Sequence, residues 1–318
     1  MSFPDTTRAS RRGTQRTFFA RLLRDLCVNW RLYLMVVPMI IYYILFHYVP
    51  MWGAQIAFKD FIPAFGIDGS QWVGLKHFTD FISSNYFSRI VGNTLIINVL
   101  LLAFSFPASI ILALLLNELR SQKYKRVVQT FSYLPHFISI MVVAGMITDF
   151  TASRGIINDI IEMFGGQRQT FLQNPNAFRP IYIVSEVWQT MGWGSIIYIA
   201  ALASIDVQQY EAALLDGANR WQKTLYITLP GIAPTIIIML IMRLGQMMNV
   251  GFEKIILLYK PSTYITADVI SSFVYRRGLE EFAYSYSTAV GMFNSVINMI
   301  FLVTANFIAR KTSETSLF

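Results

Sequence analysis

The sequence predicts an all-α membrane protein with six transmembrane helices. Hydrophobic residues make up 54% of the 318 positions and charged residues only 14%, whereas a soluble domain has roughly 25% charged residues. Six stretches contain no Asp, Glu, Lys or Arg, and they are residues 32–58, 90–117, 127–148, 187–205, 224–242 and 282–309. Roughly 20 apolar residues cross the hydrocarbon core as a helix, so each stretch is long enough to be one span.

The segment before the first span, residues 1–30, is basic. Within it, residues 18–26 place apolar side chains at helical spacing with arginines between them, which is typical of a short helix lying on the membrane surface and contacting lipid. A solvated basic tail that only sets the orientation of the chain remains the alternative. The first apolar stretch is too long for a signal peptide, and no cleavage site of small residues follows it. It is therefore predicted to be a retained span.

The distribution of charge predicts which side of the membrane each loop occupies. Short cytoplasmic loops are rich in Lys and Arg. With the N-terminus inside, the cytoplasmic segments hold 15 basic and 7 acidic residues, which accounts for the whole net charge of +8. The excess charge therefore reports topology and gives no reason to expect nucleic-acid binding. Both termini are predicted to be cytoplasmic, with a six-helix membrane domain at residues 31–310 and a tail at 311–318.

The remaining loops differ in character. Residues 59–89, 149–180 and 250–281 contain Gly, Pro, Asn and scattered charges, and they are predicted to be folded outer excursions with short helices. The cytoplasmic loop at 206–230 is more specific. Glu211 to Asp216 favours a short helix because Ala and Leu are strong helix formers, and Gly217 supplies a helix stop. A second helix follows from Trp221, so the loop is predicted to be a helix–turn–helix with small residues that permit a partner to approach closely.

This loop resembles the EAA motif of the permease subunits of bacterial ABC importers. The matching positions are Glu211, Ala212, Ala213, Asp216, Gly217, Ala218, Ile227, Leu229 and Pro230. Further segments resemble the oligosaccharide-importing branch of that family, namely residues 50–61, 251–259, 267–270, 275–278 and 284–291. The likeness covers about residues 30 to 310. The resemblance implies a type I ABC importer permease bundle in the inner, or cytoplasmic, membrane of a bacterium.

The resemblance also implies the partners. A second homologous permease would complete the path, and a dimer of ATP-binding subunits would bind ATP and Mg²⁺, leaving this chain without a cofactor. An extracytoplasmic solute-binding protein would deliver an oligosaccharide, with an acidic, alginate-like sugar as the specific expectation. The residues implied to couple this chain to the ATPase are Glu211, Ala212, Ala213, Asp216 and Gly217.

Arg243 is the candidate residue for contact with the substrate. It is the basic residue within the fifth hydrophobic region, and an ionisable group there indicates a functional site. Gln246 and Asn249 follow at i+3 and i+6, which would place all three on one helical face lining a water-filled passage. An arginine suits a carboxylate. The alternative is that Arg243 snorkels to the membrane surface or pairs with an acid such as Glu253.

The sequence does not predict an enzyme. The segment 217–224 approximates a phosphate-binding Walker A loop, but Gln222 occupies the position of the second glycine and no strand precedes it. No Cys/His cluster has metal-ligand spacing, so no metal site is expected. A secondary transporter or channel for a small polar solute remains the alternative function. Such a protein would place ionisable relays or broken helices at mid-membrane, and only Arg243 approaches that pattern.

Overall fold

The computed structural model describes residues 25–312, and the chain separates into two compact units between Gln55 and Ile56. The helix predicted at residues 18–26 lies almost entirely outside the described residues. The first unit contains α2 (Trp30–Tyr43), a π-helical turn (Ile44–Tyr48) and α3 (Val49–Trp52). None of the side chains of these elements is buried, as expected for an apolar helix whose solvent is lipid rather than water.

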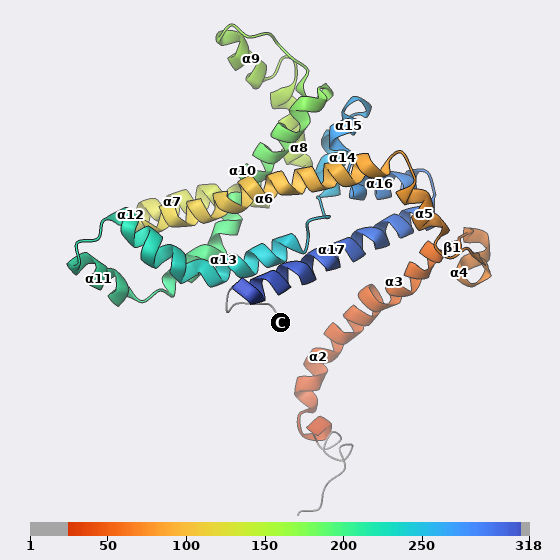
Figure 1. Ribbon diagram of the computed structural model, residues 1–318, viewed down its shortest axis with the longest axis horizontal. Coiled ribbons are helices and arrows are strands. Elements are labelled where there is room, and N and C mark those ends of the chain that lie inside the picture. Colours follow the sequence, from red (N-terminus) through yellow and green to blue (C-terminus); the bar gives the residue numbers. More distant parts are fainter. Residues whose placement is uncertain (1–24, 313–318) are drawn as a thin grey trace, which may run out of the picture. The chain divides into compact units, whose positions relative to one another are not determined.

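The second unit is almost entirely helical (Figure 1). Its longer helices are α5 (Lys76–Ile82), α6 (Phe87–Asn117), α7 (Gln122–Tyr133), α8 (Ile140–Thr151), α9 (Ile156–Met163), α10 (Pro175–Ala203), α11 (Val207–Leu215), α13 (Leu229–Leu244), α14 (Phe252–Leu258), α16 (Ile270–Tyr275) and α17 (Tyr284–Thr312). The single-turn helices are α4 (Gly66–Gly69), α12 (Arg220–Lys223) and α15 (Tyr264–Ala267).

Shorter elements connect these helices. Two-residue strands β1 (Lys59–Asp60) and β2 (Gln71–Trp72) pair antiparallel, with Lys59 opposite Trp72. In the part of the chain that the structure describes, 3₁₀ segments lie at Gly53–Phe58, Pro63–Phe65, Leu134–Phe137, Phe171–Gln173 and Pro261–Thr263. Further π-helical turns lie at Thr224–Thr228 and Arg276–Glu280. The three predicted outer excursions thus do contain short helices, α4 and α5 in the first, α9 in the second, and α14 to α16 in the third.

Five helical segments of the described residues are long and apolar enough to cross a membrane. They are Trp30–Phe58, Phe87–Asn117, Ile140–Met163, Arg220–Leu244 and Tyr284–Lys311. A sixth is reached only if α10 and α11, which are bent by 71° at a short break, count as one span. The helical character is as predicted, whereas the count of six spans and the cytoplasmic placement of both termini remain predictions.

The third apolar stretch, residues 127–148, is not one continuous helix as predicted. The chain leaves α7 at Tyr133, passes through the 3₁₀ segment that contains Pro135, and begins α8 only at Ile140. A proline lacks the backbone N–H that the helix needs and its ring crowds the preceding turn. The run of uncharged residues therefore marked an apolar region correctly but hid a break within it.

Helices α6 and α10 lie side by side (Figure 1) and form the centre of the second unit. Their contact includes a hydrogen bond between the hydroxyls of Ser105 and Thr190, which are 3.1 Å apart. At Gly192, a Cβ atom would stand only 1.9 Å from the backbone oxygen of Ser132 at the end of α7. Glycine at this position lets α10 approach α7 backbone to backbone, as small residues do in membrane helix bundles.

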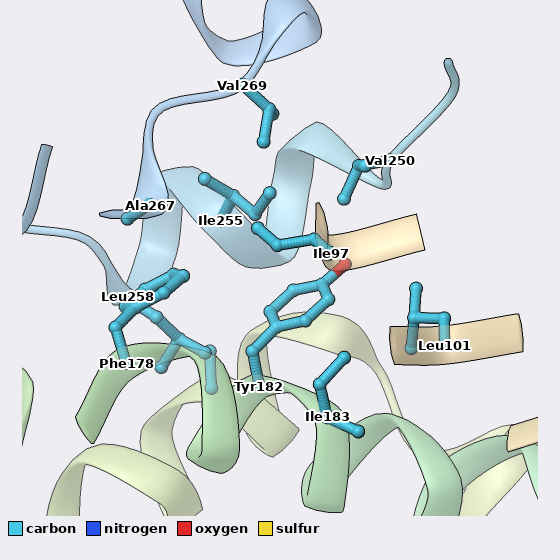
Figure 2. Packing of buried hydrophobic residues seen from close by; sticks show 11 residues of the cluster. Ile97, Leu101, Phe178, Tyr182, Ile183, Val250, Ile255, Leu258, Ala267 and Val269 are labelled. Carbon is cyan, nitrogen blue, oxygen red and sulfur yellow. The ribbon is translucent and has the colours of Figure 1, made fainter. Parts of the chain in front are cut away.

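The largest buried cluster lies between α10 and the segment that carries α14. Figure 2 shows Tyr182 rising from α10 toward α14, where Ile255 faces the same interior. Ile97 and Leu101 contribute from α6, and Val269 closes the cluster from the loop before α16. The segment after α13 is therefore packed into the bundle, and this packing positions the polar side chains described below.

Candidate functional site: a helix–turn–helix loop and a polar cavity

The loop at 206–230 forms the predicted helix–turn–helix. Helix α11 begins after Asp206, whose carboxylate accepts a hydrogen bond from the backbone N–H of Gln208 at 2.9 Å, a standard N-cap. At its other end Gly217 adopts φ +74°, a left-handed conformation that glycine adopts without a Cβ penalty. The N–H groups of Gly217 and Ala218 donate to the carbonyls of Leu214 and Ala213, which is the Schellman pattern of helix termination.

The second half of the loop starts a new helix through a capping box. The side chain of Asn219 accepts from the N–H of Gln222 at 2.9 Å, and the side chain of Gln222 accepts from the N–H of Asn219 at 2.8 Å. Such a reciprocal pair satisfies two amides at a helix start. Gln222, the residue that departs from the Walker A pattern, therefore serves to begin α12 here.

The surface of this loop is exposed and apolar. Leu215 is 89% exposed and Trp221 is 77% exposed, whereas soluble monomeric proteins rarely expose large apolar patches. Glu211, Ala212, Asp216 and Gly217 are exposed beside them, and Ala213 is half-buried. The five residues that the motif implies to be coupling residues thus lie at the same end of the loop as these exposed apolar side chains.

A polar cavity of about 230 Å³ lies in the second unit. Its charged lining consists of Glu186 on α10, Arg243 on α13, and Glu253 and Lys254 on α14. Further polar atoms come from the lining residues His136, Tyr182, Gln189, Thr190 and Asn249. Three helices and the turns around them therefore bring ionisable groups together inside an apolar bundle, which is the arrangement expected of a substrate or ion pathway.

Lys254 is the most deeply buried charge of this cavity, with 2% of its side chain exposed. Its ammonium donates to the carboxylate of Glu186 at 2.9 Å and to the side-chain oxygen of Gln189 at 3.4 Å. The ring of Tyr182 lies 5.3 Å from the same nitrogen, within the range of a cation–π contact. A buried ammonium needs such partners because an unpaired charge is costly to bury.

The predicted trio of Arg243, Gln246 and Asn249 does not share a helical face. Helix α13 ends at Leu244, because Gly245 and the residues after it turn away, so the i+3 and i+6 argument was wrong. Arg243 and Asn249 nonetheless line the same cavity, whereas Gln246 is exposed and is not among the lining residues.

The alternative reading of Arg243 as an ion-pair partner of Glu253 has no support in the described residues. Both side chains line the cavity, but within residues 25–312 no ion pair joins them, and the ion pair of the cavity is that between Lys254 and Glu186. Among the described residues, Arg243 is therefore the cavity cation that forms no ion pair.

The sequence reasoning missed Lys254 and Glu186 as a pair. The available signal was the position of Lys254 directly before the apolar run Ile255–Leu258, since a lysine within an otherwise apolar helix indicates either a buried partner or a pathway. Sequence spacing does not pair Lys254 with Glu186, because 68 residues separate the two.

A second buried charge stabilises the segment after α15. Asp268 is fully buried and its carboxylate accepts from Arg276 at 2.7 Å and from Ser272 at 2.8 Å. Burial lowers the pKa of Arg276, but the hydrogen bond and charge of Asp268 outweigh this and raise the pKa above its usual value. Burial also raises the pKa of the neighbouring Tyr259 to about 12. Because these partners are all internal, we interpret this cluster as structural.

Comparison with known proteins places the whole chain among transport proteins. Residues 105–314 match the family described as binding-protein-dependent transport system inner membrane component. The chain is 45% identical over 303 residues to Protein LplB of Bacillus subtilis (strain 168), covering 95% of this chain and 94% of that protein. It is 44% identical over 299 residues to the polygalacturonan/rhamnogalacturonan transport system permease protein YteP of the same organism, covering 94% and 93%.

Two solved structures are similar along nearly their whole length. One is a crystal structure of a bacterial ABC transporter involved in the import of the acidic polysaccharide alginate, with 46% identity, a TM-score of 0.86, and coverage of 92% of this chain and 99% of that chain. The other is the bacterial alginate ABC transporter in complex with an alginate pentasaccharide-bound periplasmic protein, with 45% identity, a TM-score of 0.86, and coverage of 93% and 100%.

Proposed function

The chain belongs to the inner membrane components of binding-protein-dependent transport systems, and we propose that it forms one half of the path by which an ABC importer moves an acidic oligosaccharide into the cytoplasm. The observation that carries the substrate class is the 46% identity to a chain of an alginate importer. The cavity supports it, because Arg243 lines it and forms no ion pair with another of the described residues.

Family membership confirms that the chain is a membrane-embedded permease of a sugar ABC importer and not an enzyme. It also removes the alternative of a secondary transporter or channel, because the members of this family work with a solute-binding protein. The energy for transport must then come from outside this chain, since the segment that approximated a Walker A loop forms a helix start instead.

In our proposal the α11 end of the loop couples this chain to ATP hydrolysis. Glu211, Ala212, Ala213, Asp216 and Gly217 would dock into a dimer of ATP-binding subunits, which bind the ATP and Mg²⁺. The exposed apolar side chains beside them, such as Leu215, supply the surface for that contact. Closure of the ATPase dimer would then pull α11 and, through the continuous helix from Arg220 to Leu244, move Arg243 and the cavity.

We further propose six membrane spans with both termini cytoplasmic. This arrangement requires α10 to cross the membrane by itself and α11 to lie at the cytoplasmic surface after the 71° bend. A second, homologous permease would complete the path, because one such chain is too small to enclose an oligosaccharide. A solute-binding protein would deliver the substrate from outside.

The test is uptake into vesicles that contain the complete complex, with the solute-binding protein outside and ATP inside. A radiolabelled uronic acid trisaccharide should accumulate only when ATP and the binding protein are both present. Uptake that continues without ATP, or purification of the chain without any ATPase subunit, would contradict the proposal. An ATP-driven complex that imports only neutral sugars would refute the acidic substrate and keep the importer.

A further inference from the structure

The two cations of the polar cavity differ in whether a carboxylate of the protein pairs with them. Lys254 is paired with Glu186 at 2.9 Å, whereas Arg243 forms no ion pair within residues 25–312. Both cations line the same cavity. An acidic sugar that enters therefore meets one cation that is open and one that already holds a carboxylate from the protein.

We propose that Glu186 is an internal stand-in for the carboxylate of the substrate, holding Lys254 until a uronate carboxylate replaces it during transport. This inference rests on the proposed function, because it assigns a specificity-determining pair to the same path.

The two members of the pair differ in a way that permits this exchange. The side chain of Glu186 is 26% exposed, and that of Lys254 is 2% exposed. The carboxylate can therefore rotate toward the water of the cavity, while the ammonium is held in place by Gln189 and by the ring of Tyr182. Lys254 is the fixed member and Glu186 the replaceable one.

The need to keep Lys254 paired makes the exchange selective. A buried ammonium that loses its carboxylate is strongly destabilised, so Glu186 can leave only if another anion takes its position. A uronate carboxylate satisfies this requirement through a charge-assisted hydrogen bond. A neutral sugar offers only hydroxyls, so it must leave the pair of Lys254 and Glu186 intact. Discrimination then arises from a difference in affinity between the two sugars.

Substitution of each member separates this mechanism from a merely structural pair. Lys254→Met removes the ammonium and keeps an unbranched apolar chain in the buried position. Glu186→Gln keeps an oxygen that can accept from Lys254 but removes the competing negative charge. The matched control is Lys260→Met, the same substitution at an exposed lysine that does not line the cavity.

The experiment measures binding to the purified complete complex in lipid nanodiscs, without the solute-binding protein. Two probes are compared, a uronic acid trisaccharide and the same trisaccharide with its carboxyls reduced to alcohols. We expect Lys254→Met to weaken binding of the acidic probe on the order of tenfold or more and to leave the reduced probe unchanged. Glu186→Gln should strengthen binding of the acidic probe alone. Lys260→Met should change neither affinity.

The outcomes are distinct. If Glu186→Gln weakens binding of the acidic probe, Glu186 supports the site and is not a stand-in, and the inference is overturned. Equal changes for both probes would likewise show that the pair is only structural. If Lys254→Met does not assemble, Glu186→Gln decides by itself. If the wild-type complex binds and imports neither sugar, the proposed function fails as well. If the wild-type complex imports the acidic sugar but the variants do not change binding as expected, only the inference about Lys254 and Glu186 fails.

Discussion

The turn at Gly217 allows the proposed coupling to be tested by a single substitution. Gly217 has φ +74°, and no atom lies within 4 Å of the place where a Cβ would stand. A Cβ atom at this position therefore meets no clash with the described residues, and we assign the cost of a leucine to the backbone. A non-glycine residue in the left-handed region loses about 1–2 kcal/mol, which shifts the local equilibrium of the turn by a factor of roughly 5–30.

We expect Gly217→Leu to separate transport from ATP hydrolysis. The strain and the added side chain both act on the end of α11 that would enter the ATPase subunit, so the complex should assemble and hydrolyse ATP while sugar uptake falls on the order of tenfold. The assays are ATP-driven uptake and phosphate release on the same vesicles. Gly217→Asn should keep most of the uptake, because Asn adopts the left-handed region more readily than leucine does.

A matched control exists in the same chain. Gly165 has φ +80° and also has no atom within 4 Å of a Cβ position, but it follows α9, far from the loop in sequence. Gly165→Leu should therefore carry the same backbone strain and leave uptake intact. The coupling reasoning is refuted if Gly217→Leu transports at the wild-type rate, or if the Gly165 variant loses uptake to the same extent.

Three further predictions concern the cavity, the buried charge and the loop. Arg243→Ala should lower uptake of a uronate trisaccharide, and unchanged uptake would exclude Arg243 from the path. Asp268→Asn should destabilise the protein by about 3–5 kcal/mol, because it leaves the charge of Arg276 without its carboxylate; a thermal-unfolding midpoint equal to that of the wild type would contradict this. Asn219→Ala should remove the cap of α12 at a cost of about 1 kcal/mol, visible as faster amide hydrogen exchange at Gln222, and unaltered exchange would show that the capping box contributes little.

Local sequence was sufficient where the physics is local. An uncharged apolar stretch can only be satisfied in lipid or in a core, so the helical, membrane-embedded class followed from the sequence alone. The end of α11 was also predictable from local sequence. A run of strong helix formers that is followed by glycine, here Gly217, commonly ends in a left-handed turn that satisfies the last carbonyls. The EAA resemblance added the identity of the family, which no periodicity could have supplied.

Sequence spacing failed where the chain changes direction. The trio built on Arg243 assumed that the helix continued, but α13 ends at Leu244, and Gln246 does not line the cavity that Arg243 and Asn249 share. The run at 127–148 hid a break at Pro135 in the same way. In both places the apolar character was read correctly, but the point at which a helix stops depends on the packing of the residues that follow.

What the sequence by itself determined is therefore the class of the protein, the apolar regions and the helix–turn–helix loop. The tertiary structure alone decided that Lys254 meets Glu186, 68 residues away, and that Arg243 faces the same cavity. The reason is physical: burial of a lysine is tolerable only with a carboxylate nearby, but which carboxylate arrives is settled by how α10 and α14 pack. No property of either residue's neighbours in sequence encodes that encounter.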